Sequence, residues 1–323
     1  MERILITGVA GFIGSNLADL LINSNYVIGI DNFDSFYSRE IKEDNIKGLI
    51  GDNNFSFYEV DLLDLDKLDK ICKAEKVDTI IHLAAKAGVR PSILDPVGYT
   101  RHNVEATVNI LEAARKNGIK NIILASSSSV YGNNIKVPFS EEDNVDYPIS
   151  PYAASKKACE LMSHSFAKLH GQKIAALRFF TVYGKRQRPD LAIAKFTRMI
   201  DKGEAIPFYG DGTTERDYTY IDDITEGIQH CMDWLVKEKE GCWEVFNLGE
   251  SQTTTLTDLV STIEAVLGKK AVINKQPMQM GDVKRTFADI SKAKSVFGYS
   301  PETDMEKGIA EYVRYYRSIR QER

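Results

Sequence analysis

The sequence predicts an α/β protein built on a doubly wound parallel sheet, with a second, smaller α/β lobe. Two observations predict this fold. Short runs rich in β-branched residues alternate with amphipathic segments through the first half of the chain, as the strands and crossover helices of a parallel sheet do. After Arg178 the alternation gives way to shorter elements, and no Pro- or Ser-rich linker separates the two halves.

The predicted strands cover residues 4–7, 27–31, 55–60, 79–83, 121–126 and 174–179. The predicted crossover helices cover residues 14–23, 65–75, 103–116 and 152–170. Later elements, which we assign to the smaller lobe, are predicted at residues 192–202, 222–236, 245–248, 256–267 and from 305 onward. We therefore expect a first domain at residues 1–177 and a second lobe at residues 178–323, interleaved with the first.

The composition excludes several classes of protein. With 323 residues, 43% hydrophobic and 27% charged, the chain belongs to the ordinary globular class, and no apolar run approaches the roughly eighteen residues of a membrane span. A net charge of −5 argues against a nucleic-acid surface. The four cysteines show no C-x-x-C spacing, so no metal site is predicted. The first strand follows Met1 directly, which predicts cytoplasmic residence.

A glycine-rich turn follows the first strand and opens the first helix. Gly8, Gly11 and Gly14 have the spacing G-x-x-G-x-x-G, with Phe12 and Ile13 between the last two. Glycine permits a tight turn and lets a pyrophosphate approach the backbone N–H groups of a helix N-terminus, where the helix dipole favours negative charge. A plain β-to-α turn is the alternative. The context favours a dinucleotide site.

Asp31 ends the second predicted strand, where a carboxylate can accept hydrogen bonds from the adenosine ribose hydroxyls. The same charge would repel a 2′-phosphate, so NAD is favoured over NADP. His82 lies within an apolar strand and is interpreted as a core histidine. Further cofactor contacts are predicted at this and later strand ends, at Asn32, Asp61, Leu62, Leu83, Ala84, Ala85 and Lys86.

Tyr152 and Lys156 are four residues apart in a predicted helix, so their side chains share one face. Alone, such a pair is most often half-exposed helix surface. Near a nicotinamide site the pair can carry out proton transfer, because a neutral phenol is a poor base and an adjacent ammonium favours the phenolate form. Ser127 lies in a serine cluster that ends a predicted strand.

The chain resembles the extended short-chain dehydrogenase/reductase family in six residues: Gly8, Gly11, Gly14, Ser127, Tyr152 and Lys156. The resemblance covers essentially the whole chain and implies a Rossmann fold that binds NAD. It implies that Tyr152 is the acid/base, that Lys156 binds the nicotinamide ribose, and that Ser127 hydrogen-bonds the reacting oxygen. Tyr152 and Lys156 are both also predicted to contact the cofactor.

Within that family, the second half is similar to nucleotide-sugar epimerases and dehydratases, on segments 178–184, 186–190, 210–212, 216–222 and 281–282. The implied substrate is a nucleoside diphosphate sugar. Arg188 and Arg216 are candidates for diphosphate contacts, because guanidinium groups offer forked donors that match phosphate oxygens. A surface arginine is the alternative for each, and a structural ion pair with Asp217 and Asp222 is a further alternative for Arg216.

The segment around Ser127 distinguishes the possible reactions. Relatives that eliminate water across sugar carbons 5 and 6 resemble this segment but carry Asp-Glu at the positions of Ser128 and Ser129. Decarboxylases of UDP-glucuronate carry Glu at the position of Ser129. The chain has no carboxylate there, so the resemblance favours 4-epimerisation.

The segments 86–92 and 187–190, together with Thr181, look most like UDP-glucuronate 4-epimerases, which form UDP-galacturonate through a 4-keto intermediate. Galactose-type epimerases usually have Asn at the position of Thr181. We expect Ser127, Ser128 and Thr181 to bind the sugar carboxylate, and Arg90 to approach the site from its loop. The alternatives are a UDP-glucose or UDP-N-acetylglucosamine 4-epimerase, a UDP-glucuronate decarboxylase and a non-catalytic NAD-binding protein.

The resemblance also implies a homodimer, because relatives often pair the helices that follow Asn103 and Tyr152 into a four-helix bundle. Leu161, Met162 and Phe166 would supply the apolar stripe of such an interface. Packing within one subunit explains these three residues equally well.

Overall fold

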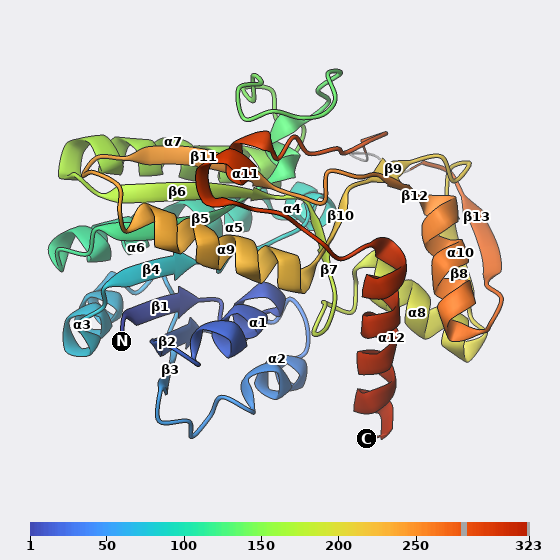
Figure 1. Ribbon diagram of the computed structural model, residues 1–323, viewed down its shortest axis with the longest axis horizontal. Coiled ribbons are helices and arrows are strands. Elements are labelled where there is room, and N and C mark those ends of the chain that lie inside the picture. The colour runs from blue at the N-terminus through green and yellow to red at the C-terminus, as the bar shows by residue number, and fades with distance from the viewer. Residues whose placement is uncertain (279–282, 322–323) are drawn as a thin grey trace.

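The protein, described here by a computed structural model, has a seven-stranded parallel sheet at its centre (Figure 1). The structure describes residues 1–278 and 283–321, so the 281–282 motif lies outside the described residues. The strand order is β11-β6-β5-β4-β1-β2-β3. Their bounds are β1 (Arg3–Thr7), β2 (Tyr26–Asp31), β3 (Phe55–Glu59), β4 (Thr79–His82), β5 (Asn121–Ser127), β6 (Lys173–Phe179) and β11 (Trp243–Leu248).

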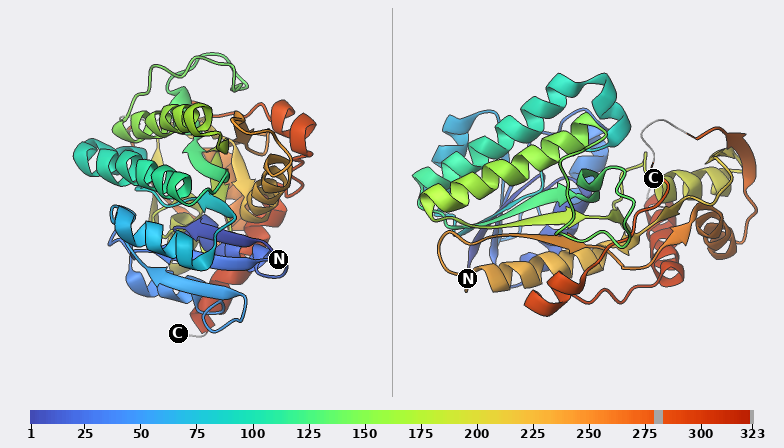
Figure 2. Two further views of the ribbon diagram at one scale, coloured as in Figure 1. Left: turned by 90° about the vertical axis from the view of Figure 1, so that its left-hand side faces the viewer. Right: turned by 90° about the horizontal axis from the view of Figure 1, so that it is seen from above.

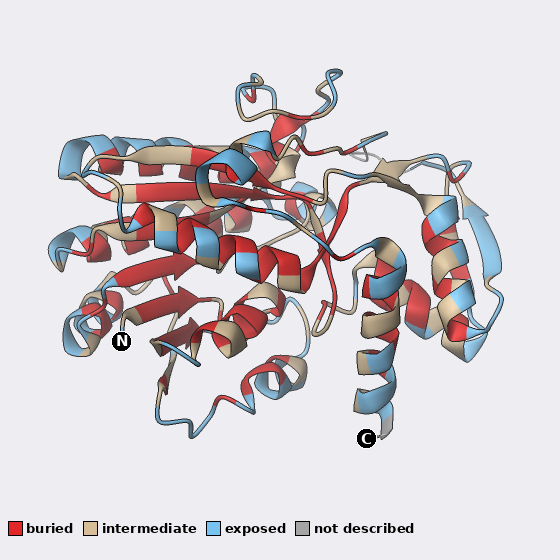
Figure 3. Ribbon diagram, viewed as in Figure 1, coloured by how far each residue is buried: buried red, intermediate tan, exposed pale blue. Residues whose placement is uncertain are grey.

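Helices cover both faces of this sheet, as the doubly wound prediction requires (Figure 2). One face packs against α3 (Leu65–Glu75), α6 (Ala106–Lys116) and α7 (Pro151–His170). The other face packs against α1 (Phe12–Leu21) and α9 (Ile221–Leu235). The central strands are buried along most of their length (Figure 3), which explains why they read as continuous apolar runs.

Two assignments to the smaller lobe were wrong. The strand expected there at residues 245–248 is β11, which pairs in parallel with β6 and forms an edge of the central sheet. Helix α9, expected in the smaller lobe at residues 222–236, instead covers the central sheet as a crossover helix. A run of apolar residues cannot by itself show which sheet a strand joins, because that depends on pairing with distant segments.

The smaller lobe lies beyond the carboxyl ends of the central strands (Figure 1). It contains α8 (Ala192–Lys202), α10 (Leu256–Leu267) and α12 (Met305–Gln321), with β8 (Ala205–Tyr209) paired in parallel to β13 (Val272–Gln276). Its apolar residues continue the core of the α1/α9 face without a break, so the two parts share one core.

The remaining elements are short and connect these layers. The segment predicted as one helix from residue 103 begins earlier, as a π-helical turn η1 (Thr100–Glu105), and continues into α6. The others are α2 (Arg39–Ile46), α4 (Val89–Leu94), α5 (Pro96–Tyr99), the 3₁₀ turn η2 (Ser128–Tyr131), α11 (Ser291–Phe297), β7 (Thr181–Tyr183), β9 (Glu215–Arg216), β10 (Tyr218–Tyr220) and β12 (Thr254–Thr255).

Candidate active site

A cavity of about 480 Å³ opens where the carboxyl ends of the central strands meet the smaller lobe. This is the expected place for a ligand in a doubly wound sheet. Of the site residues predicted from the sequence, all but Arg90 and Arg216 line this cavity. The cavity therefore joins the predicted cofactor residues to the predicted catalytic residues in one space.

The glycine turn leaves no room for a side chain at two of its glycines unless the neighbouring backbone moves. Gly8 has φ +72°, and a Cβ there would lie 2.9 Å from the backbone of Ala84. A Cβ on Gly14 would lie 2.2 Å from the carbonyl oxygen of Gly8. Helix α1 begins at Phe12, with Gly11 as its N-cap and no acidic residue in its first turn. Its first N–H groups therefore face the cavity without a competing carboxylate, which suits a pyrophosphate.

Asp31 lies at the end of β2, with 8% of its surface exposed. Its Oδ2 accepts from the N–H of Ala10 (3.1 Å) and its Oδ1 accepts from the N–H of Phe33 (2.8 Å). Burial raises the pKa of this carboxyl above its ordinary value, against the effect of the two backbone donors and of Lys42. The two N–H donors fix the carboxylate at the strand end, where ribose hydroxyls can also reach it.

Two further predicted residues meet beside Asp31. Asn32 donates from Nδ2 to Oδ2 of Asp61 (3.0 Å), and the other oxygen of Asp61 accepts from the N–H of Leu63 (2.9 Å). This bond ties the ends of β2 and β3 together. It leaves a polar rim at the end of the cavity that we assign to adenosine.

Helix α7 presents Tyr152 and Lys156 to the cavity because of where it begins. Ser150 caps it, accepting from the N–H of Ala153 (3.1 Å), and Pro151 occupies the first turn. Lys156 is 5% exposed, and its Nζ donates to the carbonyl oxygen of Ala125 on β5 (2.7 Å). The ammonium is thereby held at the end of β5, one helical turn from Tyr152.

Tyr152 packs against a second tyrosine that the sequence did not single out. The rings of Tyr99 and Tyr152 meet edge to face with centroids 6.2 Å apart. Tyr99 is buried and donates its hydroxyl to the carbonyl oxygen of Ala87 (2.9 Å). Edge-to-face packing of this kind restricts the rotation of the Tyr152 ring.

Ser127 takes part in local capping and still keeps a donor for the cavity. Its Oγ accepts from the backbone N–H of Ser129 (3.2 Å) and from the Ser129 hydroxyl (2.9 Å). A serine hydroxyl has two lone pairs and one hydrogen. With both lone pairs used by Ser129, the hydrogen remains to be donated to a bound oxygen.

A buried ion pair supports the strand end that carries Ser127. Glu160 on α7 and Arg178 on β6 are 1% and 2% exposed, and they form two hydrogen bonds of 2.9 Å. Glu160 also accepts from the hydroxyl of Ser126 (2.6 Å). Burial alone would raise the pKa of Glu160, but Arg178 and Ser126 outweigh it and hold that pKa below its usual value.

Asn103 is a second positioning residue that the sequence did not reveal. It is buried in η1, its Oδ1 accepts from the N–H of Lys86 (2.8 Å), and its Nδ2 donates to the Lys86 carbonyl (3.0 Å) and to Ser155 Oγ (2.9 Å). It therefore joins the segment after β4 to α7. No motif marked it, because the helix around it reads as ordinary amphipathic sequence.

The carboxylates among the described residues that line the cavity are Asp31, Asp34 and Asp61. Asp31 ends β2, Asp34 follows it, and Asp61 follows β3. Residues 126–129 and Thr181 contribute hydroxyls to the same lining. The serine segment at the end of β5 therefore brings hydroxyls and no carboxylate to the cavity.

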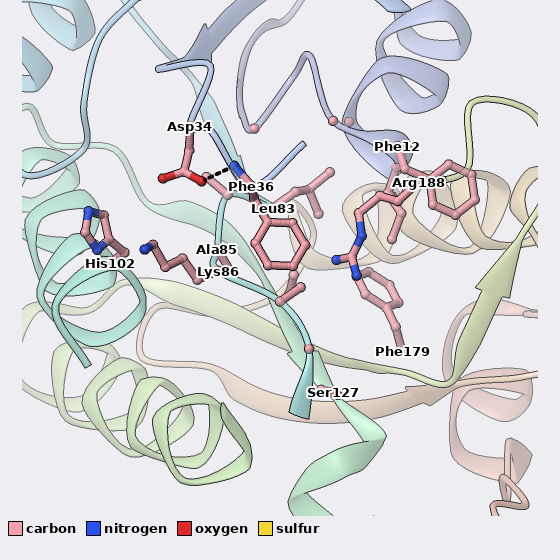
Figure 4. Close-up of a pocket in the computed structure, with 18 of the residues that line it drawn as sticks. Phe12, Asp34, Phe36, Leu83, Ala85, Lys86, His102, Ser127, Phe179 and Arg188 are labelled. Carbon is pink, nitrogen blue, oxygen red and sulfur yellow. Dashed lines mark hydrogen bonds between the residues drawn. The ribbon is translucent and has the colours of Figure 1, made fainter. Parts of the chain in front are cut away.

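The predicted arginines separate into two groups. Arg188 lines the cavity, pairs with both oxygens of Asp190 (3.0 and 2.8 Å) and lies over the ring of Phe36, 4.9 Å from its centroid (Figure 4). Arg90 lies outside the cavity lining, with its guanidinium over the ring of Tyr209 at 5.5 Å.

Arg216 lies on β9, outside the cavity lining, and donates to the carbonyl oxygen of Glu215 (2.8 Å). The two carboxylates considered as ion-pair partners for Arg216 bond to other groups. Asp217 is buried and accepts from backbone N–H groups, among them that of Glu250 (2.7 Å), and Asp222 pairs with Lys185 (3.5 Å).

His82 is a satisfied core histidine, as expected. Its ring nitrogens hydrogen-bond the hydroxyls of Thr7 (2.7 Å) and Thr107 (3.1 Å). Burial and the nearby Lys156 lower its pKa to about 3. Among the described residues no helix is long and apolar enough to span a membrane, and no group of three or more His, Cys, Asp or Glu side chains is placed to hold a metal.

The residues present fit NAD. The glycine cradle admits no side chain at its closest approaches, and the buried hydroxyl of Tyr37, which lines the cavity, has no hydrogen-bond partner. Phe36, Tyr37 and Lys42 also line the cavity, and sequence reasoning missed all three. Their position just after Asp31 was the available signal.

Comparison with known proteins agrees with this geometry. The family model described as GDP-mannose 4,6 dehydratase matches residues 5–312. The chain is similar to an uncharacterized protein of Methanocaldococcus jannaschii (44% identical, covering 98% of this chain and 96% of that protein). It is similar to a UDP-glucuronate 4-epimerase of Thermodesulfobacterium geofontis (38% identical, covering 98% and 96%).

Among solved structures, a UDP-glucuronic acid 4-epimerase from Bacillus cereus, in complex with UDP-glucuronic acid and NAD, superposes with a TM-score of 0.91. It is 36% identical, and the match covers 98% of this chain and 99% of that one. These matches span the sheet, the cavity and the smaller lobe together. The chain belongs to the extended short-chain dehydrogenase/reductase family.

Proposed function

We propose that this chain is an NAD-dependent UDP-sugar 4-epimerase that interconverts UDP-glucuronate and UDP-galacturonate through a 4-keto intermediate. One observation carries the choice of reaction. Tyr152 and Lys156 line one cavity with Ser127, Ser128 and Thr181, and positions 127–129 carry hydroxyls where a carboxylate would supply a further acid or base. The reaction is therefore limited to moving one proton and one hydride, without the extra acid and base that dehydration needs.

In this reaction Tyr152, as phenolate, takes the proton from the hydroxyl at sugar carbon 4. NAD supplies a reversible acceptor for the hydride that leaves the same carbon. Ser127 donates its hydroxyl hydrogen to the carbonyl oxygen that forms. After the keto-sugar rotates in the site, the hydride is returned to the other face of carbon 4 and Tyr152 returns the proton to the oxygen. NAD is regenerated in each cycle, so the enzyme needs a retained cofactor.

A carboxylated sugar adds a difficulty. With a ketone at carbon 4, the carboxylate attached to carbon 5 belongs to a β-keto acid, which loses carbon dioxide when the breaking bond aligns with the carbonyl π system. Ser128 and Thr181 offer uncharged donors beside Ser127. We infer that these hydroxyls hold the carboxylate out of that alignment.

Proton NMR of the purified protein with UDP-glucuronate, without added NAD, tests the reaction. We expect UDP-galacturonate to appear. UDP-xylose as the main product would move the assignment to a decarboxylase, and no product would favour a non-catalytic NAD-binding protein. The same experiment with UDP-glucose and UDP-N-acetylglucosamine decides between the acidic and the neutral sugars.

Product analysis of Ser128→Ala and Thr181→Ala tests the carboxylate restraint. We expect slower epimerisation, with part of the turnover diverted to UDP-xylose. Ser165→Ala, at an exposed position on α7, is the matched control and should behave as the parent. The restraint is wrong if both variants keep the parent's turnover and release no pentose nucleotide.

We also propose the division of labour expected from the sequence, with NAD bound by residues 1–177 and the sugar nucleotide completed by residues 178–323. Arg188, which already lines the cavity, is the stronger candidate for the diphosphate. Arg216 and Arg90 reach the substrate in this proposal only after the smaller lobe moves closer. Isothermal titration with UDP should show a larger loss of affinity for Arg188→Ala than for Arg90→Ala.

A homodimer in the cytoplasm completes the proposal. On α7, Leu161 is 58% exposed, whereas Met162 and Phe166 pack against the core of their own subunit. Leu161 therefore supports an interface, and the other two residues are accounted for within one chain. Light scattering should give a dimer that Leu161→Lys weakens, and cell fractionation should place the protein in the soluble fraction.

A further inference from the structure

The segment after β2, residues 32–38, lies along the cofactor cavity and contacts the second half of the chain (Figure 4). Its Phe36 ring lies against the guanidinium of Arg188, 4.9 Å from the ring centroid. Both side chains line the cavity. Phe36 lies in the first half of the chain and Arg188 in the second, so their contact joins the segment after β2 to the 184–190 segment.

The Arg188 side of this contact is held firmly. Its guanidinium makes two hydrogen bonds to Asp190, and its side chain is 16% exposed. The segment that carries it is fixed to α1: Arg186 donates to Ser15 O (3.1 Å), and Asn16 donates to Lys185 O (3.1 Å). Arg188 is therefore anchored to the helix whose N-terminus suits the pyrophosphate.

The Phe36 side is braced by its own segment. The N–H of Phe36 donates to Asp34 Oδ1 (2.9 Å), and the N–H of Asp34 donates to Asn32 Oδ1 (3.0 Å). Lys42 on α2, which is buried, donates to Asp34 O (2.6 Å) and lies over the Tyr37 ring at 4.8 Å. These bonds give the segment a defined shape across the cavity.

Tyr37 supplies a group that lacks a partner. Tyr37 lines the same cavity, and its hydroxyl is buried and has no hydrogen-bond partner. Buried hydroxyls without a partner are rare in native proteins. The charges of Asp31, Arg188 and Asp190 all act on this hydroxyl.

We propose that Phe36 and Tyr37 form a clasp that retains NAD. Phe36, stacked on Arg188, holds the segment across the cavity, and the Tyr37 hydroxyl donates to the bound dinucleotide. The proposed chemistry requires one NAD to stay bound through many turnovers, and the clasp would slow the release of that NAD. The proposal rests on NAD being the cofactor and does not depend on which UDP-sugar reacts.

The test is the rate at which the purified holoenzyme releases NAD, measured without UDP-sugar. The protein is diluted into a large excess of NADH, and NADH fluorescence at the protein reports each exchange. Phe36 is 37% exposed, and a cation–π contact at an exposed site is weaker than a desolvated one, so we expect Phe36→Ala to speed release roughly 2- to 5-fold. A lost neutral hydrogen bond predicts about 3- to 10-fold for Tyr37→Phe.

Conservative variants separate the ring contact from general packing. Phe36→Tyr keeps an aromatic face for Arg188 and should release NAD at the parent's rate, whereas Phe36→Leu keeps apolar bulk and should release it as fast as Phe36→Ala. Tyr147→Phe, at an exposed position far along the chain, is the control for loss of a hydroxyl. All variants are first compared by thermal unfolding, and only those that fold as the parent are interpreted.

Parent-like release from both Phe36→Ala and Tyr37→Phe would overturn the clasp. So would equally fast release from Phe36→Tyr and Phe36→Ala, because the aromatic stack would then have no role. A change in Phe36→Ala alone would keep the stack and remove the Tyr37 contact from the proposal. These outcomes concern cofactor exchange, so they are separate from success or failure with UDP-glucuronate.

Discussion

Replacing Gly14 with alanine should remove most of the retained NAD. The new Cβ would lie 2.2 Å from the carbonyl oxygen of Gly8 and 2.9 Å from the Val9 Cα. Ordinary contacts of a Cβ begin at 3.4 Å, so the turn must open by roughly 1 Å because packed backbone cannot compress. Overpacking of this kind costs about 1–3 kcal/mol in stability.

The displaced turn would also move the N–H groups that face the pyrophosphate. Hydrogen bonds to charged groups contribute about 1.5–3 kcal/mol each, and a loss of that size lowers affinity roughly 10- to 100-fold. The assay is the amount of NAD per protein molecule after desalting, together with the affinity for added NAD by titration. Thermal unfolding in the presence of NAD should show a smaller stabilisation than in the parent.

Two other glycines make this a graded series. A Cβ on Gly11 would approach the Gly8 oxygen only to 3.0 Å, and a Cβ on Gly48 would meet nothing within 4 Å. We therefore expect NAD content to fall slightly in Gly11→Ala, strongly in Gly14→Ala and not at all in Gly48→Ala. Parent-like NAD content in a folded Gly14→Ala protein would refute the assignment of this turn to the pyrophosphate.

Three further predictions follow from the site and its supports. Tyr152→Phe should lower kcat by about 100- to 10,000-fold with NAD content unchanged, and a smaller loss in steady-state assays would remove Tyr152 as the acid/base. Glu160→Gln leaves Arg178 buried without its charge partner, which should lower the free energy of unfolding by about 3–5 kcal/mol and the Tm by roughly 6–10 °C. A Tm shift within 1 °C would contradict this. Burial, with Asp223 and Asp217 nearby, raises the pKa of Glu250 to about 8. The protonated carboxyl therefore stabilises the folded state fully below the pKa that Glu250 has in the unfolded chain, and this contribution is lost as the pH rises through 8. Thermal scans from pH 5 to 9 should therefore show a smaller decline in Glu250→Gln than in the parent, and parallel curves would exclude this group.

The sequence was most informative where a residue's role depends on its immediate neighbours. The glycine turn, the end of β2 at Asp31 and the start of α7 at Pro151 are all set by local sterics and capping, and each lies where its motif indicated. The strand bounds agree to within a residue or two because a buried parallel strand is apolar throughout. Such features are encoded within a few residues.

The sequence was least informative where a role depends on distant pairing. β11 joins the central sheet through β6, from which about sixty residues separate it along the chain, and no pattern within β11 shows this. Asn103 likewise acts by bridging Lys86 and Ser155, which only the folded chain brings together. Both failures have one cause, since long-range contacts are not recorded in local periodicity.

The choice among related reactions depends on which side chains are absent as much as on which are present. The fold, the NAD site and the pair Tyr152 and Lys156 serve epimerases and dehydratases alike, so none of them distinguishes the reaction. We expect Ser128 and Ser129 to distinguish it, because the relatives that eliminate water or decarboxylate carry a carboxylate where these hydroxyls stand. Introducing one tests this directly. We expect Ser129→Glu to shift products from UDP-galacturonate toward UDP-xylose, while Ser129→Gln, of the same size but uncharged, slows epimerisation without that shift. Equal product ratios in the two variants would show that charge at this position does not select the reaction.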